Sequence, residues 1–150
     1  MNPEPHLSLI AKTIQLSVAP VFLLTGIGTV LAVLTGRLNR IVDRARILEE
    51  RLTSVPKNIE AEIRSELSVL SRRAKFVNHA LTLGTVGGLL ICWVIASMFA
   101  GVFLSIDLAA DVVAFLFVAA MLAFIGALLA FLGEIFIAVK NLRIGMKQTP

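Results

Sequence analysis

The sequence has little of what proteins use for catalysis and metal binding. It contains one cysteine, Cys92, no tyrosine and two histidines in 150 residues. A lone cysteine excludes a disulfide framework within the chain and a thiolate metal site. His6 and His79 are far apart in the sequence, and no set of serine, histidine and acid converges. No glycine-rich loop precedes a helix in a phosphate-binding pattern. We therefore expect no catalytic residue, no bound metal, no cofactor and no enzyme activity.

Charge is absent over long stretches, and this absence defines the fold class. Hydrophobic residues make up 57% of the chain, and the mean hydropathy is +0.89. Residues 14–36 and 80–106 carry no charge, and residues 112–139 carry only Glu134. Each stretch exceeds the roughly 20 residues with which a helix spans a bilayer. The sequence predicts a single all-α membrane domain, 1–150, with three transmembrane helices in contact with lipid.

The basic residues are distributed unevenly, and this predicts the orientation. Ten of the fourteen lysines and arginines lie between Arg37 and Lys75, whereas the connection 105–111 holds only Asp107 and Asp111. Basic loops stay on the cytosolic side of a membrane. We expect residues 37–79 and the C-terminus in the cytosol and the N-terminus outside, in a bacterial inner membrane or its equivalent. The pI of about 9.8 follows from this topology, so we expect no nucleic-acid partner.

Residues 37–79 have the pattern of an antiparallel coiled-coil hairpin. The apolar positions recur at spacings of three and four in both arms: Leu38, Ile41, Ala45, Leu48, Leu52 and Val55, then Ile63, Leu67, Leu70, Ala74, Val77 and Leu81. Pro56 is expected to end the first arm, and Asn58 to cap the second. No helix breaker separates an arm from its span, so each should continue that span as one helix of more than 40 residues. Packing within one chain and packing between chains both remain open.

Glu134 is the most informative single residue, because a carboxylate inside an apolar helix must be paired, protonated or hydrated. It shares a helix face with small residues, which predicts that it points into the bundle. Its expected partners are the basic groups at the same depth: Arg37, Arg40, Lys75 and His79. A structural ion pair and an ion or proton site are both consistent with this pattern.

Further charged residues crowd both arms next to the predicted membrane surface: Asp43, Arg44, Arg46, Arg72 and Arg73. One interpretation is a set of ion pairs on the hairpin, since Asp43 is at helical spacing from neighbouring arginines. Another is a site for anionic lipid head groups, because a basic ring at this depth attracts them. The two interpretations are compatible.

Small residues recur at helix-packing intervals in all three spans: Gly28 and Gly36, then Gly84 and Gly88, then Gly126 and Gly133. Such spacing lets helices approach closely and, with only three spans, favours a homo-oligomer. Pro20 is expected to kink the first span or to leave a short interfacial helix before it.

Three charged motifs follow one another along the chain: Arg37-x-x-Arg40-x-x-Asp43-Arg44-x-Arg46, Glu66-Leu67-x-x-Leu70-x-Arg72-Arg73 and Phe131-x-x-Glu134. Their order resembles an uncharacterised bacterial family of three-span membrane proteins, domain of unknown function 2721. The resemblance covers about residues 14–143, supports the topology and implies no established activity.

The function expected from these features is that of a non-enzymatic, self-associating membrane scaffold, with the hairpin available for assembly or for docking a protein partner. Two alternatives remain open. One is a homo-oligomeric channel in which Thr25, Thr29 and Glu134 line a path. The other is an insertase-like biogenesis factor, because the layout of spans and hairpin is similar to that of YidC-type insertases.

Overall fold

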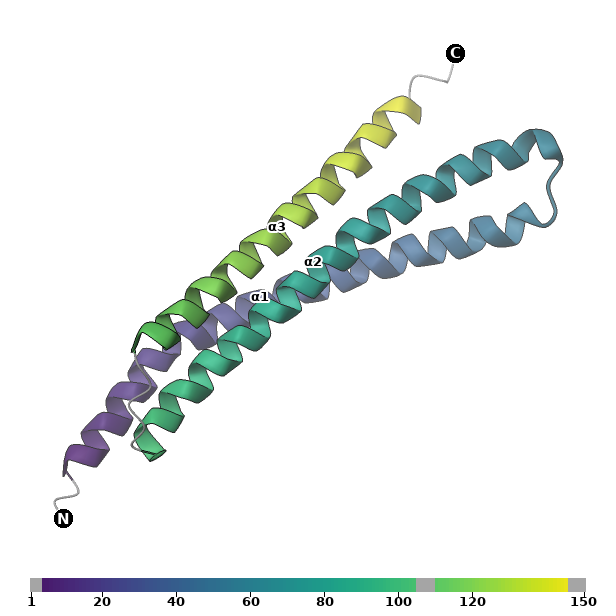
Figure 1. Ribbon diagram of the computed structural model, residues 1–150. Helices are drawn as coiled ribbons and strands as arrows, with labels where there is room; N and C mark the ends of the chain where they lie inside the picture. Colours follow the sequence, from purple (N-terminus) through teal and green to yellow (C-terminus); the bar gives the residue numbers. More distant parts are fainter. Residues whose placement is uncertain (1–3, 105–109, 146–150) are drawn as a thin grey trace. The chain divides into compact units, whose positions relative to one another are not determined.

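In the computed structural model, the described residues of the chain form three long helices (Figure 1). They are α1 (Glu4–Leu52), α2 (Lys57–Leu104) and α3 (Ala110–Gly145), and each contains an apolar stretch long enough to cross a membrane. The structure describes residues 4–104 and 110–145, and side-chain surroundings within 7–56, 59–102 and 111–139. His6 and Asp107 lie outside the described side chains. The predicted all-α fold with three helices able to span a membrane is confirmed.

Both hairpin arms continue their spans without a break. α1 has 49 residues and α2 has 48, so the predicted continuity of arm and span is confirmed. α1 also runs through Pro20, so no separate short helix precedes the first span in the part of the chain that the structure describes, while the expected kink at Pro20 stays a prediction. A proline removes only one helical hydrogen bond, and the many remaining bonds of a long apolar helix keep it continuous.

The turn between α1 and α2 is shorter than predicted. The backbone N–H groups of Ile59 and Glu60 donate to the Pro56 carbonyl over 3.0 and 3.3 Å, so α2 begins at Lys57. Asn58 therefore lies in the first turn and is not the cap that we expected. Proline fits the start of a helix because its φ is already near the helical value. At the other end, the Ser54 N–H donates to the Arg51 carbonyl over 3.0 Å and closes α1.

The chain divides into two compact units, each made of parts of all three helices. The first comprises Met1–Leu31 and Leu83–Ile125, and the second comprises Ala32–Thr82 and Gly126–Pro150. In the first unit, Ile27, Ile91 and Ala120 form the buried centre. α2 and α3 come close there at Gly87, where an added Cβ would lie 3.3 Å from the Ala120 carbonyl oxygen. A glycine at this position is what allows the two helices to approach.

Buried positions recur every seven residues along each helix. They are Pro20, Ile27, Leu34, Ile41 and Leu48 in α1, Ile63, Leu70, Val77, Gly84 and Ile91 in α2, and Ala120, Ala127 and Glu134 in α3. This interval is typical of helices that pack side by side through interlocking side chains. The repeat places a carboxylate, Glu134, at a position that apolar residues occupy elsewhere.

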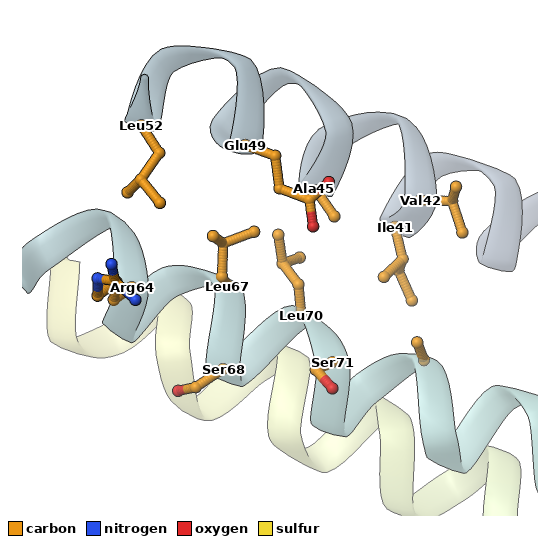
Figure 2. Close-up of a pocket in the computed structure, with 11 residues that line it drawn as sticks. Ile41, Val42, Ala45, Glu49, Leu52, Arg64, Leu67, Ser68, Leu70 and Ser71 are labelled. Atoms are coloured by element: carbon orange, nitrogen blue, oxygen red, sulfur yellow. The ribbon is translucent and has the colours of Figure 1, made fainter. Parts of the chain in front are cut away.

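The two arms of the second unit pack through apolar side chains (Figure 2). Ile41 of α1 points toward α2, Leu67 and Leu70 of α2 point toward α1, and a groove of about 440 Å³ lies between them. Arg44 of α1 also bonds Glu66 of α2 over 2.8 Å. By contrast, only 17, 22 and 11% of the residues in the most apolar windows of α1, α2 and α3 are buried within the chain. The remaining apolar surface is suited to contact with lipid.

Candidate functional site

A fully buried carboxylate lies at the centre of the second unit. Glu134 of α3 has an exposed fraction of 0%, and both of its oxygens accept hydrogen bonds. Oε2 accepts from Arg37 Nη1 of α1 over 3.0 Å, and Oε1 accepts from Arg73 Nε and Nη2 of α2 over 3.1 and 2.7 Å. Each helix thus contributes one side chain, and we call this set of three the Glu134 clamp.

The seven-residue repeat explains why these side chains meet. Arg37 follows buried Leu34 by three residues, and Arg73 follows buried Leu70 by three residues, so both arginines flank the packed face of their helix at equivalent positions. Glu134 follows buried Ala127 by seven residues and lies on the packed face of α3. Residues three or seven apart on a helix share a face. The clamp is therefore built into the packing pattern.

Apolar groups surround the clamp on two sides. The Arg37 guanidinium carbon lies 5.0 Å from the centre of the Phe131 ring, within the range of a cation–π contact. At Gly133, beside Glu134, an added Cβ would lie 3.3 Å from Cε1 of Phe76. Water is scarce near such groups, so the attraction between the carboxylate and the guanidinium groups is stronger than it would be in solvent.

The clamp fixes geometry more than it adds stability. Burying a carboxylate carries a large desolvation penalty that its partners offset only with good hydrogen bonds. Glu134 has three of them, while the side chains of Arg37 and Arg73 keep exposed fractions of 41 and 26%. One acid between two bases leaves a formal charge of +1. The arrangement can hold three helices in register and attract an anion.

Comparison with known proteins identifies the family. A family model described as Protein of unknown function (DUF2721) matches residues 17–144. The chain belongs to this family. No curated protein and no solved structure matches it. All three residues of the clamp lie within the part that matches DUF2721, but the description of the family names no activity.

The other predicted partners of Glu134 lie elsewhere in this DUF2721 protein. Arg40, Lys75 and His79 are exposed, and the Nδ1 atom of His79 lies 2.7 Å from the Lys75 carbonyl oxygen of its own helix. Arg73 was expected among the surface groups of the hairpin, but its guanidinium bonds Glu134. Its position three residues after Leu70 and four before Val77 is the signal that could have placed it on the packed face.

Of the remaining predicted hairpin residues, Arg44 forms an ion pair between the arms, and its partner is Glu66. Arg44 donates from Nε and Nη2 to Glu66 Oε1 over 3.0 and 2.8 Å. Asp43, Arg46 and Arg72 are exposed and form no ion pair with any residue that the structure describes. They are available to solvent or to lipid head groups.

The predicted packing glycines fall into two groups. Gly84 and Gly88 are buried, and an added Cβ at Gly88 would lie 3.6 Å from Ile27 Cγ2. Gly126 and Gly133 are half-buried in α3. Gly28 and Gly36 are exposed, and among the described residues nothing comes within 4 Å of a Cβ built on either. The glycines of α1 leave an open face, whereas those of α2 serve packing within the chain.

The residues named for a channel are Thr25 and Thr29 of α1 and Glu134 of α3. The Thr25 hydroxyl donates to the Val21 carbonyl over 3.2 Å, and the Thr29 hydroxyl donates to the Thr25 carbonyl over 3.0 Å. Both bonds lie within α1. The Glu134 carboxylate is covered, and its oxygens are engaged by arginines. This geometry favours a structural role for Glu134.

Proposed function

We propose that the protein is a non-enzymatic membrane scaffold that self-associates and presents its helical hairpin on the cytosolic side for assembly with other proteins. The observation that carries the proposal is the Glu134 clamp. Because α1, α2 and α3 each contribute one side chain, the clamp ties both hairpin arms to the third helix. A hairpin held at its base in this way suits docking and assembly.

The position of the clamp along the helices supports this role. The uncharged stretch of α1 ends at Arg37, that of α2 begins after Lys75 and His79, and that of α3 ends at Glu134. The clamp therefore lies near the ends of the uncharged stretches of α1 and α2 and about 9 Å of helix rise before Lys140 of α3, close to the expected level of the membrane surface. The density of basic residues beyond it supports a cytosolic location of the hairpin.

The hairpin beyond the clamp is long enough to reach a partner. From Arg37 to Leu52 the first arm rises about 24 Å at 1.5 Å per residue. Buried leucines and isoleucines at seven-residue intervals, together with the Arg44–Glu66 pair, support a coiled coil between the arms. Most charged residues lie on its outer surface, where a partner would meet them.

Self-association is supported by the open face of α1. Gly28, Ala32 and Gly36 are exposed at four-residue intervals. Small residues at this spacing let the backbones of two membrane helices approach closely, and close approach is what favours association in lipid. Copies of the chain should therefore meet along this face of α1.

Disulfide cross-linking in membranes tests the proposal. In a Cys92→Ala background, which removes the one native thiol, we expect Gly28→Cys and Ala32→Cys to give dimers under mild oxidation. Val33→Cys is the matched control, because it is exposed at the same depth but lies about 100° around the helix from Ala32. Cross-links that form equally at Val33, or at none of the three positions, would contradict association through this face.

A further inference from the structure

We infer that a pocket of four arginines beside the Glu134 clamp binds a phosphate group. The pocket lies within the second unit, has a volume of about 310 Å³ and is lined by Arg37, Arg40, Ile41, Arg44, Leu70 and Arg73. Ligand pockets in proteins commonly have about 300–1,000 Å³. Of the described residues that line it, four carry a positive charge and none carries a negative charge.

The charge of this arginine pocket is only partly compensated. Glu134 is shared between Arg37 and Arg73, and Glu66 pairs with Arg44. Four guanidinium groups and two carboxylates leave a formal charge of +2. Arg40 is exposed and has no partner among the residues that the structure describes. A negatively charged phosphate group would offset this excess positive charge.

The hydrogen bonds to Glu66 and Glu134 orient three of the guanidinium groups and leave other N–H donors of these groups available to a ligand. Arg44 and Arg73 each donate to a glutamate through Nε and Nη2, so the second terminal nitrogen, Nη1, stays available on both. Arg37 uses only Nη1 toward Glu134, and Arg40 keeps all five of its N–H donors. Three of the four guanidinium groups are thus held in place before a ligand arrives, which lowers the entropic penalty of binding.

A phosphate group fits this set of donors better than a smaller anion. Its oxygens can accept bonds from several guanidinium groups at once, and arginine forms paired, charge-assisted hydrogen bonds with phosphate. Ile41 and Leu70 add apolar wall to the arginine pocket. The pocket lies next to the clamp, where the apolar stretches of the helices end, so the phosphate of a lipid head group is within reach. Free phosphate has the same chemistry.

Binding to the full chain in detergent tests this inference. The thermal unfolding midpoint is measured while short-chain phosphatidylglycerol, short-chain phosphatidylcholine or inorganic phosphate is added. We expect phosphatidylglycerol to raise the midpoint and the half-effective concentration to increase roughly tenfold in Arg40→Gln, since a charged hydrogen bond is lost. Arg46→Gln is the control, because Arg46 is exposed on the same arm and outside the pocket.

The three probes distinguish the source of the phosphate. An effect of phosphatidylglycerol or phosphatidylcholine that weakens in Arg40→Gln supports a lipid head group, and an equal effect of inorganic phosphate that weakens likewise supports a soluble anion. The same half-effective concentration in both variants, or no shift of the natural chain with any probe, would overturn the inference. The pocket belongs to one chain, so this result does not depend on whether copies cross-link.

Discussion

At the residue scale, two arginine–glutamate contacts of the same protein differ in burial. Glu134 is completely covered, whereas the Glu66 side chain that pairs with Arg44 is 43% exposed. Water screens the exposed pair, and such pairs contribute about 0–1 kcal/mol. A buried carboxylate has no water to replace its partners, and removing its charge leaves two guanidinium groups facing a neutral group. The two glutamates should therefore respond differently to the same substitution.

We expect Glu134→Gln to lower the stability of the detergent-solubilised protein by about 2 kcal/mol, the order of a lost charge-assisted hydrogen bond. Glu66→Gln removes the same charge from the exposed pair and should change stability by less than about 1 kcal/mol. Thermal unfolding of both variants checks the difference. Equal shifts of the two midpoints would mean that the clamp contributes no more than a surface ion pair.

The sequence predicts which residues lie at the same depth in the membrane as Glu134, but it does not predict which of their side chains point toward Glu134. Arg37, Arg40, Lys75 and His79 all lie at a similar distance along their helices from the apolar stretch, and depth alone cannot choose among them. In the structure, the position of a residue around its helix axis decides whether it bonds Glu134, because only residues beside the packed face of α1 or α2 reach α3. Arg73 and its neighbour Arg72 differ by about 100° around α2, and this rotation separates a clamp residue from an exposed one.

At the element scale, the lengths of the helices could be read from the sequence and the details of their ends could not. Long apolar stretches joined to heptads without a breaker predict α1 and α2 well, since both signals extend over many residues. The start of α2 depends on a local feature, the Pro56 carbonyl that accepts the first hydrogen bonds of the helix. Asn58 was expected to be the cap only because of its residue type, and several residue types suit a turn. The continuity of α1 at Pro20 depends on the rest of the helix, which a local rule does not include.

The close approach of α2 and α3 at Gly87 leaves little room for a side chain at this position. A methyl group there would lie 3.3 Å from the Ala120 carbonyl oxygen and 3.5 Å from the Phe124 backbone nitrogen, and a helix backbone yields less easily than a side chain. We expect Gly87→Ala to destabilise the detergent-solubilised protein by about 1–3 kcal/mol through overpacking, measured as a lower unfolding midpoint.

Gly26→Ala is the matched control for Gly87→Ala. Among the described residues, nothing lies within 4 Å of a Cβ built on Gly26, so the methyl group should be tolerated without loss of stability. If the two alanine variants unfold at the same temperature, the contact between α2 and α3 at Gly87 is looser than the structure indicates.

At the scale of the whole molecule, the distribution of charge predicts which end of the helices lies in the cytosol. Of the ten basic residues from Arg37 to Lys75, two belong to the clamp and seven lie beyond it, on the arms that the turn at Pro56 joins. The start of α3 carries only the acidic Asp111 in its first turn. Moving ten basic residues across a membrane against the positive-inside bias is strongly disfavoured, whereas an acidic connection crosses readily.

Thiol labelling of intact cells tests this orientation. In a Cys92→Ala background, Asp111→Cys should react with a membrane-impermeant maleimide from outside, because Asp111 is exposed at the start of α3. Ser54→Cys lies in the exposed turn between the arms and should react only after the membrane is opened. Both sites are exposed and are expected on opposite sides of the membrane, so unequal labelling reports topology directly. Labelling of Ser54→Cys in intact cells would place the hairpin outside and would remove the basis for a cytosolic scaffold.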